Sequence, residues 1–201
     1  MERFQDENRW LGSFGDIINV KCPQCASQAV VKRTFKSERY YSDSRVLECK
    51  NCYYSIKEGT VKYRASVDTY CCNNEDKIQF KSQLLNEKPD KIKLKCPVCN
   101  EIKEFKPVIT EIPFVLNTDN KLTREFSFNA ELWYQKEFGK SIFWAYNIEH
   151  INYLERYIKA SLRERNNNGS YNGTLVSRLP KFVKEAKNRE KLLKILEKWK
   201  K

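Results

Sequence analysis

Six of the eight cysteines in this chain form three C-x-x-C pairs, and the other two, Cys71 and Cys72, are adjacent. The three pairs are Cys22 with Cys25, Cys49 with Cys52, and Cys96 with Cys99. Thiolates at this spacing typically hold Zn²⁺ in closed, tetrahedral structural sites with four sulfur ligands. The first ten residues, MERFQDENRW, lack the apolar segment of a signal peptide, so we expect a cytoplasmic protein with reduced thiols. The cysteines therefore indicate metal binding rather than disulfides.

The cysteine spacing repeats along the chain. Twenty-three residues separate Cys25 from Cys49, and 23 also separate Cys72 from Cys96. A shift of 47 positions carries three of the first four cysteines onto three of the last four, which indicates an internal duplication. We therefore expect two zinc ions per chain. The expected ligands are Cys22, Cys25, Cys49 and Cys52 for one ion and Cys71, Cys72, Cys96 and Cys99 for the other.

The second set departs from the repeat at one position, because the shift requires a ligand at Thr69 and the chain offers Cys71 instead. Neighbouring side chains on a strand point to opposite faces, so Cys71 and Cys72 can share a metal only where the chain turns. The following Asn73 and Asn74 favour a turn. Alternatively, one of the two cysteines is a buried thiol and another group, such as His150, completes the site. A crossed arrangement of the four pairs also satisfies the spacing.

Other chemistries find little support in the motifs. Thioredoxin-type redox chemistry needs a cysteine at a helix N-terminus, and four thiolates around zinc leave no position for a reacting water. The chain has no phosphate-binding loop of the G-x-x-x-x-G-K-[ST] type, no H-E-x-x-H and no G-x-S-x-G. Residues PD at 89–90 and EFK at 104–106 imitate a metal-dependent nuclease, but Cys96 and Cys99 interrupt the spacing. We expect no enzymatic activity and no small-molecule substrate.

The segments around the cysteines predict short antiparallel strands. Residues 28–35 and 45–50 flank a polar loop, and residues 77–85 and 91–96 flank a second one. This is the layout of a zinc ribbon, in which the metal holds a sheet too small to fold alone. Residues 101–117, with Pro107 and Pro113, are expected to form an edge strand or extended arm.

The C-terminal half is predicted to contain an aromatic hairpin and two or three basic amphipathic helices. Residues 125–135 and 140–147 form the hairpin, whose aromatic side chains serve as core or as a base-stacking platform. A first helix is expected over 148–165, capped by Asn147, and a second one over 174–187, with Pro180 near its first turn. A third helix follows Asn188, which can cap it. The fold class is then α+β: tandem zinc ribbons over 1–105, followed by a hairpin-and-helix domain over 106–201.

The charge of the chain is concentrated near its C-terminus. Residues 151–201 hold 14 lysines and arginines against five glutamates, which gives +9 of the total of +12. Such a balance favours a polyanionic partner, with nucleic acid the leading candidate. No run approaches the roughly 18 apolar residues of a membrane span, so no membrane partner is expected. The candidate nucleic-acid contacts are Arg163, Arg165, Arg178, Lys181, Lys184, Lys187 and Arg189.

Two resemblances accompany these patterns. The cysteine pairs over about residues 20–100 resemble the zinc-ribbon superfamily, including the transcription-factor-B-type ribbons of transcription and replication proteins. The C-terminal segments FWAYNIEHINYLERYIKASLRER and SRLPKFVKEAKNRE resemble a group of uncharacterised bacterial zinc-ribbon proteins. That group shares W-A-Y-N-x-E-H-L and S-R-L-P-x-W-x-K-x-A-K-N-R patterns, from which Ile151 and Phe182 depart. The resemblance implies a shared fold and supplies no catalytic residue.

Together these patterns predict a non-catalytic zinc protein that binds nucleic acid, DNA in the first instance, with little sequence specificity. The alternative is an adaptor whose fold is held by zinc and which docks onto a protein partner. That partner would be an enzyme of a larger bacterial complex for nucleic-acid processing or defence. Nucleic-acid binding and protein docking both occur on zinc ribbons, so the fold alone does not choose between them.

Overall fold

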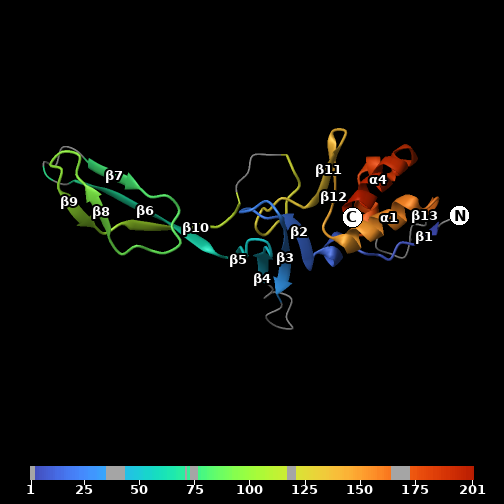
Figure 1. The fold of residues 1–201 in the computed structure, drawn as a ribbon, viewed down its shortest axis with the longest axis horizontal. Coiled ribbons are helices and arrows are strands. Elements are labelled where there is room, and N and C mark those ends of the chain that lie inside the picture. The colour runs from blue at the N-terminus through green and yellow to red at the C-terminus, as the bar shows by residue number, and fades with distance from the viewer. Residues whose placement is uncertain (1–2, 35–43, 71, 73–76, 117–120, 164–172) are drawn as a thin grey trace. The chain divides into compact units, whose positions relative to one another are not determined.

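The computed structural model describes residues 3–34, 44–70, 72, 77–116, 121–163 and 173–201 of the chain. The chain divides into two compact units: unit 1 comprises Met1–Glu58 and Leu116–Lys201, and unit 2 comprises Gly59–Val115 (Figure 1). Small antiparallel sheets occur in both units and the described helices lie in unit 1, so the α+β class is confirmed. The units differ from the expected division at residue 105, since residues 3–34 and 44–58 belong with the C-terminal half. Whether 1–105 unfolds separately stays a prediction.

A four-stranded antiparallel sheet carries the first four cysteines of unit 1. Its order is β2-β3-β4-β5, so each strand pairs with its neighbour in sequence. Alternate side chains such as Ile18, Val20, Val31 and Leu47 are fully buried, as expected for strands with one face on a core. The bounds are β2 (Ile17–Lys21), β3 (Gln28–Thr34), β4 (Ser44–Glu48) and β5 (Ser55–Lys57).

Backbone hydrogen bonds tie this sheet to the C-terminal half of the chain. Asn19 N donates to Tyr146 O at 2.7 Å, and Trp133 N donates to Asn19 O at 2.9 Å. The Asn147 side chain donates to Phe14 O at 2.8 Å and to Ile17 O at 2.7 Å. The first cysteine-bearing sheet is therefore built into unit 1 and does not stand apart as an independent ribbon.

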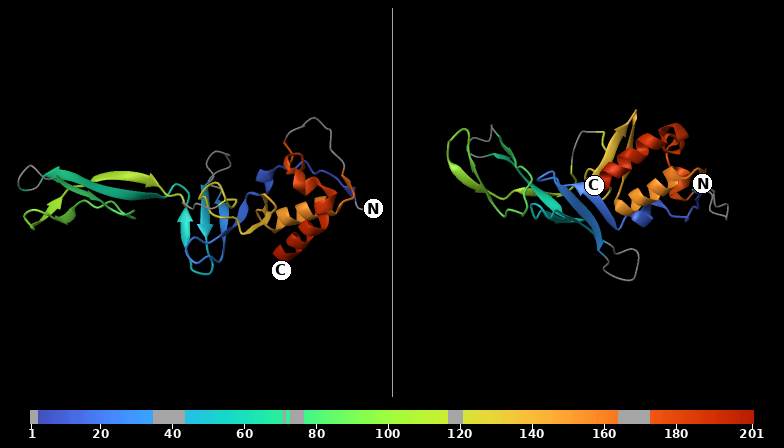
Figure 2. Two further views of the ribbon diagram at one scale, coloured as in Figure 1. Left: turned by 90° about the horizontal axis from the view of Figure 1, so that it is seen from above. Right: turned by 45° about the vertical axis from the view of Figure 1, so that its right-hand side comes forward.

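A hairpin and the described helices form the rest of unit 1 (Figure 2). A hairpin is present with Gly139 at φ 62° in its turn, but the bounds predicted for its first strand are wrong: that strand spans Tyr134–Phe138 and not 125–135. Helix α1 packs against α4, and their buried apolar side chains form one core with Phe14 and Phe143. The bounds are β1 (Arg3–Phe4), η1 (Leu11–Phe14), β11 (Tyr134–Phe138), β12 (Ser141–Ala145), α1 (Ile148–Lys159), β13 (Leu162–Arg163), α2 (Leu175–Arg178), α3 (Lys181–Lys184), η2 (Ala186–Asn188) and α4 (Arg189–Trp199).

Three details of the predicted helices are wrong. Helix α1 ends at Lys159 rather than 165, because Ala160 has an extended backbone that leads into β13. Strand β13 pairs in parallel with β1, and Leu162, which the predicted helix would have buried, is exposed. The second helix is split into α2 and α3, because Pro180 lacks the N–H that a continuous helix needs. Asn188 makes no capping bond and instead donates to Phe182 O at 2.9 Å. The cap by Asn147 is confirmed: its Oδ1 accepts from His150 N at 2.9 Å.

Unit 2 contains a three-stranded and a two-stranded antiparallel sheet. The orders are β10-β6-β7 and β8-β9, so β10 is an edge strand, as predicted for the segment with Pro107 and Pro113. The bounds are β6 (Val61–Tyr70), β7 (Lys77–Lys81), β8 (Ile92–Lys95), β9 (Ile102–Phe105) and β10 (Val108–Pro113).

The strands themselves follow the 47-residue repeat. Shifted by 47 positions, β4 would span 91–95 and β5 would span 102–104, and the structure has β8 at Ile92–Lys95 and β9 at Ile102–Phe105. The two copies differ in one pairing: β3 pairs with β4, whereas among the described residues β7 pairs with β6 alone and β8 with β9 alone. We call the unpaired boundary between β7 and β8 the seam.

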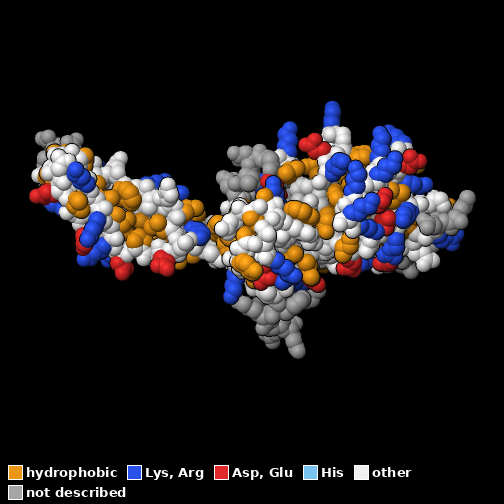
Figure 3. Space-filling view, in the orientation of Figure 1, with side chains coloured by type: hydrophobic (Ala, Val, Ile, Leu, Met, Phe, Trp, Pro, Cys, Tyr) orange, Lys and Arg blue, Asp and Glu red, His pale blue; other side chains and the backbone are white. Residues whose placement is uncertain are grey.

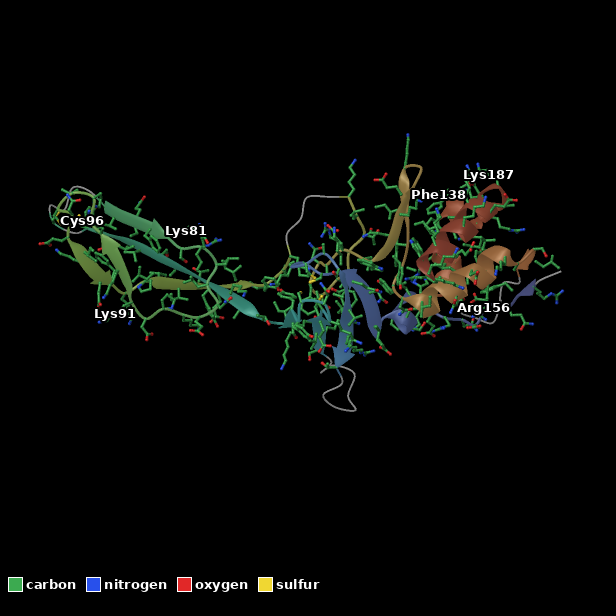
Figure 4. All side chains as sticks on the ribbon, in the orientation of Figure 1. Lys81, Lys91, Cys96, Phe138, Arg156 and Lys187 are labelled. Atoms are coloured by element: carbon green, nitrogen blue, oxygen red, sulfur yellow. The ribbon has the colours of Figure 1, made fainter. Side chains whose placement is uncertain are left out.

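Like charges would meet at two positions of the seam, against one position, Arg33 opposite Arg45, in the pairing of β3 with β4. In unit 1, β3 and β4 set Val30 opposite Glu48 and Thr34 opposite Ser44. The same register in unit 2 would set Lys77 opposite Lys95 and Lys81 opposite Lys91. Like charges directly opposite each other destabilise an antiparallel pair. Figure 4 shows Lys81 and Lys91 on opposite sides of unit 2.

Candidate metal centres

The first four cysteines meet at one end of the β2–β5 sheet. Cys22 and Cys25 lie in the turn between β2 and β3, and Cys49 and Cys52 lie in the turn between β4 and β5. Their four sulfur atoms all lie within 4.8 Å of one another. Cys22 Sγ is 3.6 Å from Cys52 Sγ, and Cys25 Sγ is 3.6 Å from Cys49 Sγ. Tetrahedral sulfurs about 2.3 Å from a zinc ion are roughly 3.8 Å apart, so this group fits the metal.

The backbone of each C-x-x-C turn has the same conformation. Ala26, Tyr53 and Asn100, which follow the second cysteine of each pair, have φ values of 60°, 58° and 60°. Ala26 N donates to Cys22 O at 3.0 Å, and Asn100 N donates to Cys96 O at 3.0 Å. This left-handed conformation folds each turn back on itself, so that both sulfurs of a pair face one point. Sequence reasoning did not single out these three positions, although their place directly after each pair identifies them.

Two neighbouring groups act on the thiols of the first set. Asn51 Nδ2 donates to Cys25 Sγ at 3.6 Å, and this hydrogen bond lowers the pKa of Cys25 to about 5. Burial acts in the other direction on Cys22, whose pKa is raised. Gln24 N points its hydrogen at Cys22 Sγ, 3.4 Å away. Donors aimed at sulfur are typical of turns built to hold thiolates, because an anionic sulfur is the stronger acceptor.

The second group brings together Cys72, Cys96 and Cys99. Their sulfurs lie within 4.8 Å of one another, and Cys72 Sγ is 3.8 Å from Cys96 Sγ. Cys72 is exposed, whereas Cys96 is buried. Cys96 lies in the turn that connects β8 with β9 (Figure 4). Cys71, the fourth expected ligand, lies outside the described residues. The described part of this group therefore offers three sulfurs with spacing suited to one metal.

His150 does not join either cysteine group. It is buried in the core of unit 1, its ring stacked on Phe14 with 4.8 Å between centroids. Its Nδ1 accepts from Tyr146 N at 3.2 Å. Burial lowers the pKa of His150 to about 3, so the ring is neutral at pH 7. The alternative in which His150 completes a cysteine site therefore finds no support in its position.

No acidic cluster joins the two cysteine groups as a possible metal site among the described residues. Asp90 and Glu104, the carboxylates of the nuclease-like pattern, are not brought together into such a cluster. Glu104 instead forms ion pairs with Lys91 at 2.9 Å and with Lys93 at 3.7 Å.

The predicted nucleic-acid contacts occupy different environments. Arg178, Lys181 and Lys187 are exposed, and Lys187 pairs with Glu185 at 3.4 Å. Two other side chains form hydrogen bonds within the protein: Lys184 Nζ donates to Ser177 O at 2.9 Å, and Arg189 Nη2 donates to Ala160 O at 3.1 Å. The backbone of Arg163 belongs to β13, where it lies opposite Phe4 of β1. Arg165 lies outside the described residues.

A row of lysines on α4 lies beside these contacts. Lys191, Lys194 and Lys198 are spaced by three and four residues, so they share one exposed helix face about 10 Å long. None of the three has an ion-pair partner within the described part of the chain. Figure 3 shows many lysine and arginine side chains over the helices of unit 1. The sequence predicted a basic amphipathic helix here but did not place these lysines among the contacts; their helical spacing is the signal that identifies them. We call Lys191, Lys194 and Lys198 the α4 lysine row.

No described helix is both long and apolar enough to cross a membrane. Comparison of the chain with protein-family models, curated proteins and solved structures found no match. Function is therefore inferred from the geometry of the cysteine groups and of the charged surface.

Proposed function

We propose that the protein is a non-catalytic zinc protein that binds nucleic acid through the basic helices of unit 1. The observation that carries the zinc part is the approach of Cys22, Cys25, Cys49 and Cys52 from two turns, with sulfur–sulfur distances of 3.6 Å. Four thiolates fill the coordination sphere of zinc, so its contribution is to hold the turns and not to activate water. In unit 2, Cys72, Cys96 and Cys99 supply three ligands, and Cys71 completes a second tandem zinc ribbon.

The nucleic-acid part of the proposal is supported by positive charges that no ion pair neutralises within the described residues. The α4 lysine row is exposed and unpaired within the described residues, and Lys181 is exposed nearby in sequence. Such side chains neutralise phosphates and release counterions, which gives affinity that does not depend on sequence. The hydrophobic face of α4 is packed into the core through Leu192, Ile195 and Leu196, so the lysines face solvent. The cytoplasmic location expected from the sequence is compatible with such a partner.

A salt titration tests this proposal. The parent chain, loaded with zinc, should shift a labelled oligonucleotide at low salt, and its affinity should fall steeply as salt rises. Replacing Lys191, Lys194 and Lys198 together by alanine should weaken binding to all sequences alike. The salt slope should fall by about 1 for each lysine that neutralises a phosphate in the parent.

The matched control replaces Lys81, Lys95 and Lys106 of unit 2 by alanine, because these exposed lysines give the same change of net charge. It should retain the parent's salt slope. If both triple variants lose affinity equally, net charge alone drives binding and the α4 lysine row has no special part. If the parent shows no shift at low salt, the nucleic-acid proposal fails.

A protein-docking function is the second candidate, and exposed apolar side chains in unit 2 favour it. Ile102 on β9 is 68 % exposed and Val108 on the edge strand β10 is 70 % exposed. An edge strand with apolar side chains can accept a strand from a partner. Replacing Ile102 and Val108 by threonine should then abolish co-purification of a defined partner and leave oligonucleotide binding unchanged.

A further inference from the structure

An apolar cavity of about 220 Å³ lies within unit 1, between α1, strand β12 of the hairpin and the α2–α3 segment. Phe143, Trp144 and Phe182 contribute aromatic walls, and the remaining lining is largely aliphatic. Pockets for drug-sized ligands measure about 300–1,000 Å³, so this cavity is suited to a smaller group such as one planar ring system.

The polar side chains of the lining residues carry hydrogen-bond donors. His150 lines the cavity, and because its Nδ1 accepts from Tyr146 N, the proton of the neutral ring lies on Nε2. That Nε2 is buried and has no hydrogen-bond partner within the described residues. Arg178 and Trp144 are the other lining residues whose side chains carry polar hydrogens, and no carboxylate side chain lines the cavity. A planar ligand that carries hydrogen-bond acceptors suits these walls.

The charge around the cavity indicates how such a ligand is attached. Arg178 lines the cavity and is exposed, and Lys181 follows it on the first turn of α3, also exposed. Lys184 lies one turn further along α3. Cations beside an aromatic cavity match a ring that is linked to phosphates, because phosphates bind lysine and arginine while the base stacks on aromatic side chains.

We propose that this cavity takes one unstacked base of a single-stranded nucleic acid, with the flanking phosphates on Arg178 and Lys181. The inference rests on the nucleic-acid function proposed above and narrows it from nucleic acid in general to unpaired strands. In a duplex the bases are paired and stacked, so reaching the cavity would require extruding one of them at a cost in free energy.

The experiment compares three fluorescein-labelled probes on the zinc-loaded full chain: a short single strand of mixed sequence, its duplex, and a strand of equal length without bases. The abasic strand keeps the phosphates and removes the stacking group. The single strand should bind at least about tenfold more tightly than the abasic strand at the same salt, as expected for one stacked base. The duplex should resemble the abasic strand.

Cavity filling supplies the protein side of the test. Leu179 lines the cavity and is partly buried, so Leu179→Trp should reduce single-strand affinity to the abasic level and leave abasic binding unchanged. Leu193→Trp is the matched control, since Leu193 packs on the same core without lining the cavity, and it should bind every probe as the parent does. As a check that needs no substitution at Leu179, the single strand should quench Trp144 fluorescence and the abasic strand should not. Trp144→Phe should remove that quenching.

Equal affinity of the parent for the single and abasic strands would overturn base insertion while leaving the proposed function intact. Unchanged single-strand binding by Leu179→Trp would also overturn base insertion, because the filled cavity would then have no part in binding the strand. Absence of binding to every probe at low salt would instead defeat the nucleic-acid proposal itself.

Discussion

Cys25 Sγ lies 3.6 Å from Cys49 Sγ, although 23 residues separate the two cysteines in sequence. The approach is produced by antiparallel pairing of β3 with β4, which brings the turn before β3 and the turn after β4 to the same end of the sheet. The metal ligands are thus positioned by strand register as well as by the two-residue spacers.

The first prediction is a stoichiometry of two zinc ions per chain. Native mass spectrometry of the purified protein should show both, and Cys49→Ser should lose one of them, because three thiolates bind the metal far less tightly than four. Cys72→Ser and Cys71→Ser should each lose the other ion. Retention of two ions by Cys71→Ser would show that the second site takes its fourth ligand elsewhere.

The second prediction concerns the left-handed residue Ala26, with φ 60°. An L-residue with a Cβ is strained by about 1–2 kcal/mol in this conformation, and glycine is not. Ala26→Gly should therefore stabilise the zinc-loaded protein by about 0.5–1 kcal/mol after the greater chain entropy of glycine is subtracted. The melting temperature with saturating zinc measures the change. Ala29→Gly, in buried strand β3, is the control and should destabilise by a similar amount.

The third prediction follows from the seam. In the register of unit 1, Lys95→Glu would place a glutamate opposite Lys77. The corresponding residue of unit 1 is already a glutamate, Glu48, which forms an ion pair with Lys32 on the neighbouring strand. Opposite charges across a strand pair contribute roughly 0.2–1 kcal/mol, so the variant should favour pairing of β7 with β8. Slower amide hydrogen exchange in β7 and β8 would report it. Lys93→Glu has the same net charge but would face Gln79, and should protect these amides less.

The sequence was sufficient for features that depend on local pattern. The residue pattern of the segments beside the cysteines predicted strands there, and Asn147 was identified as a cap from its residue type and place. Features that depend on distant contacts were not predictable in this way. The end of α1 at Lys159 depends on pairing between β1 and β13, and the burial of His150 depends on Phe14 and Trp144. The open seam becomes evident only when the two copies are compared residue by residue.

The last prediction concerns His150 and pH. Burial lowers its pKa from 6.5 to about 3 in the folded protein, so between these values the unfolded chain binds a proton that the folded chain does not. Stability from this group is therefore complete above about pH 6.5 and is lost as the pH falls toward 3, at a rate of up to about 1.4 kcal/mol per pH unit.

Acid also protonates the cysteine thiolates, so the measurement must isolate the histidine. His150→Gln keeps an acceptor for Tyr146 N and does not titrate in this range. The free energy of unfolding, followed by tryptophan fluorescence at a series of pH values, should fall more steeply in the parent than in the variant below pH 6.5. Thiolate protonation is common to both proteins and cancels in the difference. Parallel curves would mean that His150 titrates alike in the folded and the unfolded chain, so that burial does not lower its pKa.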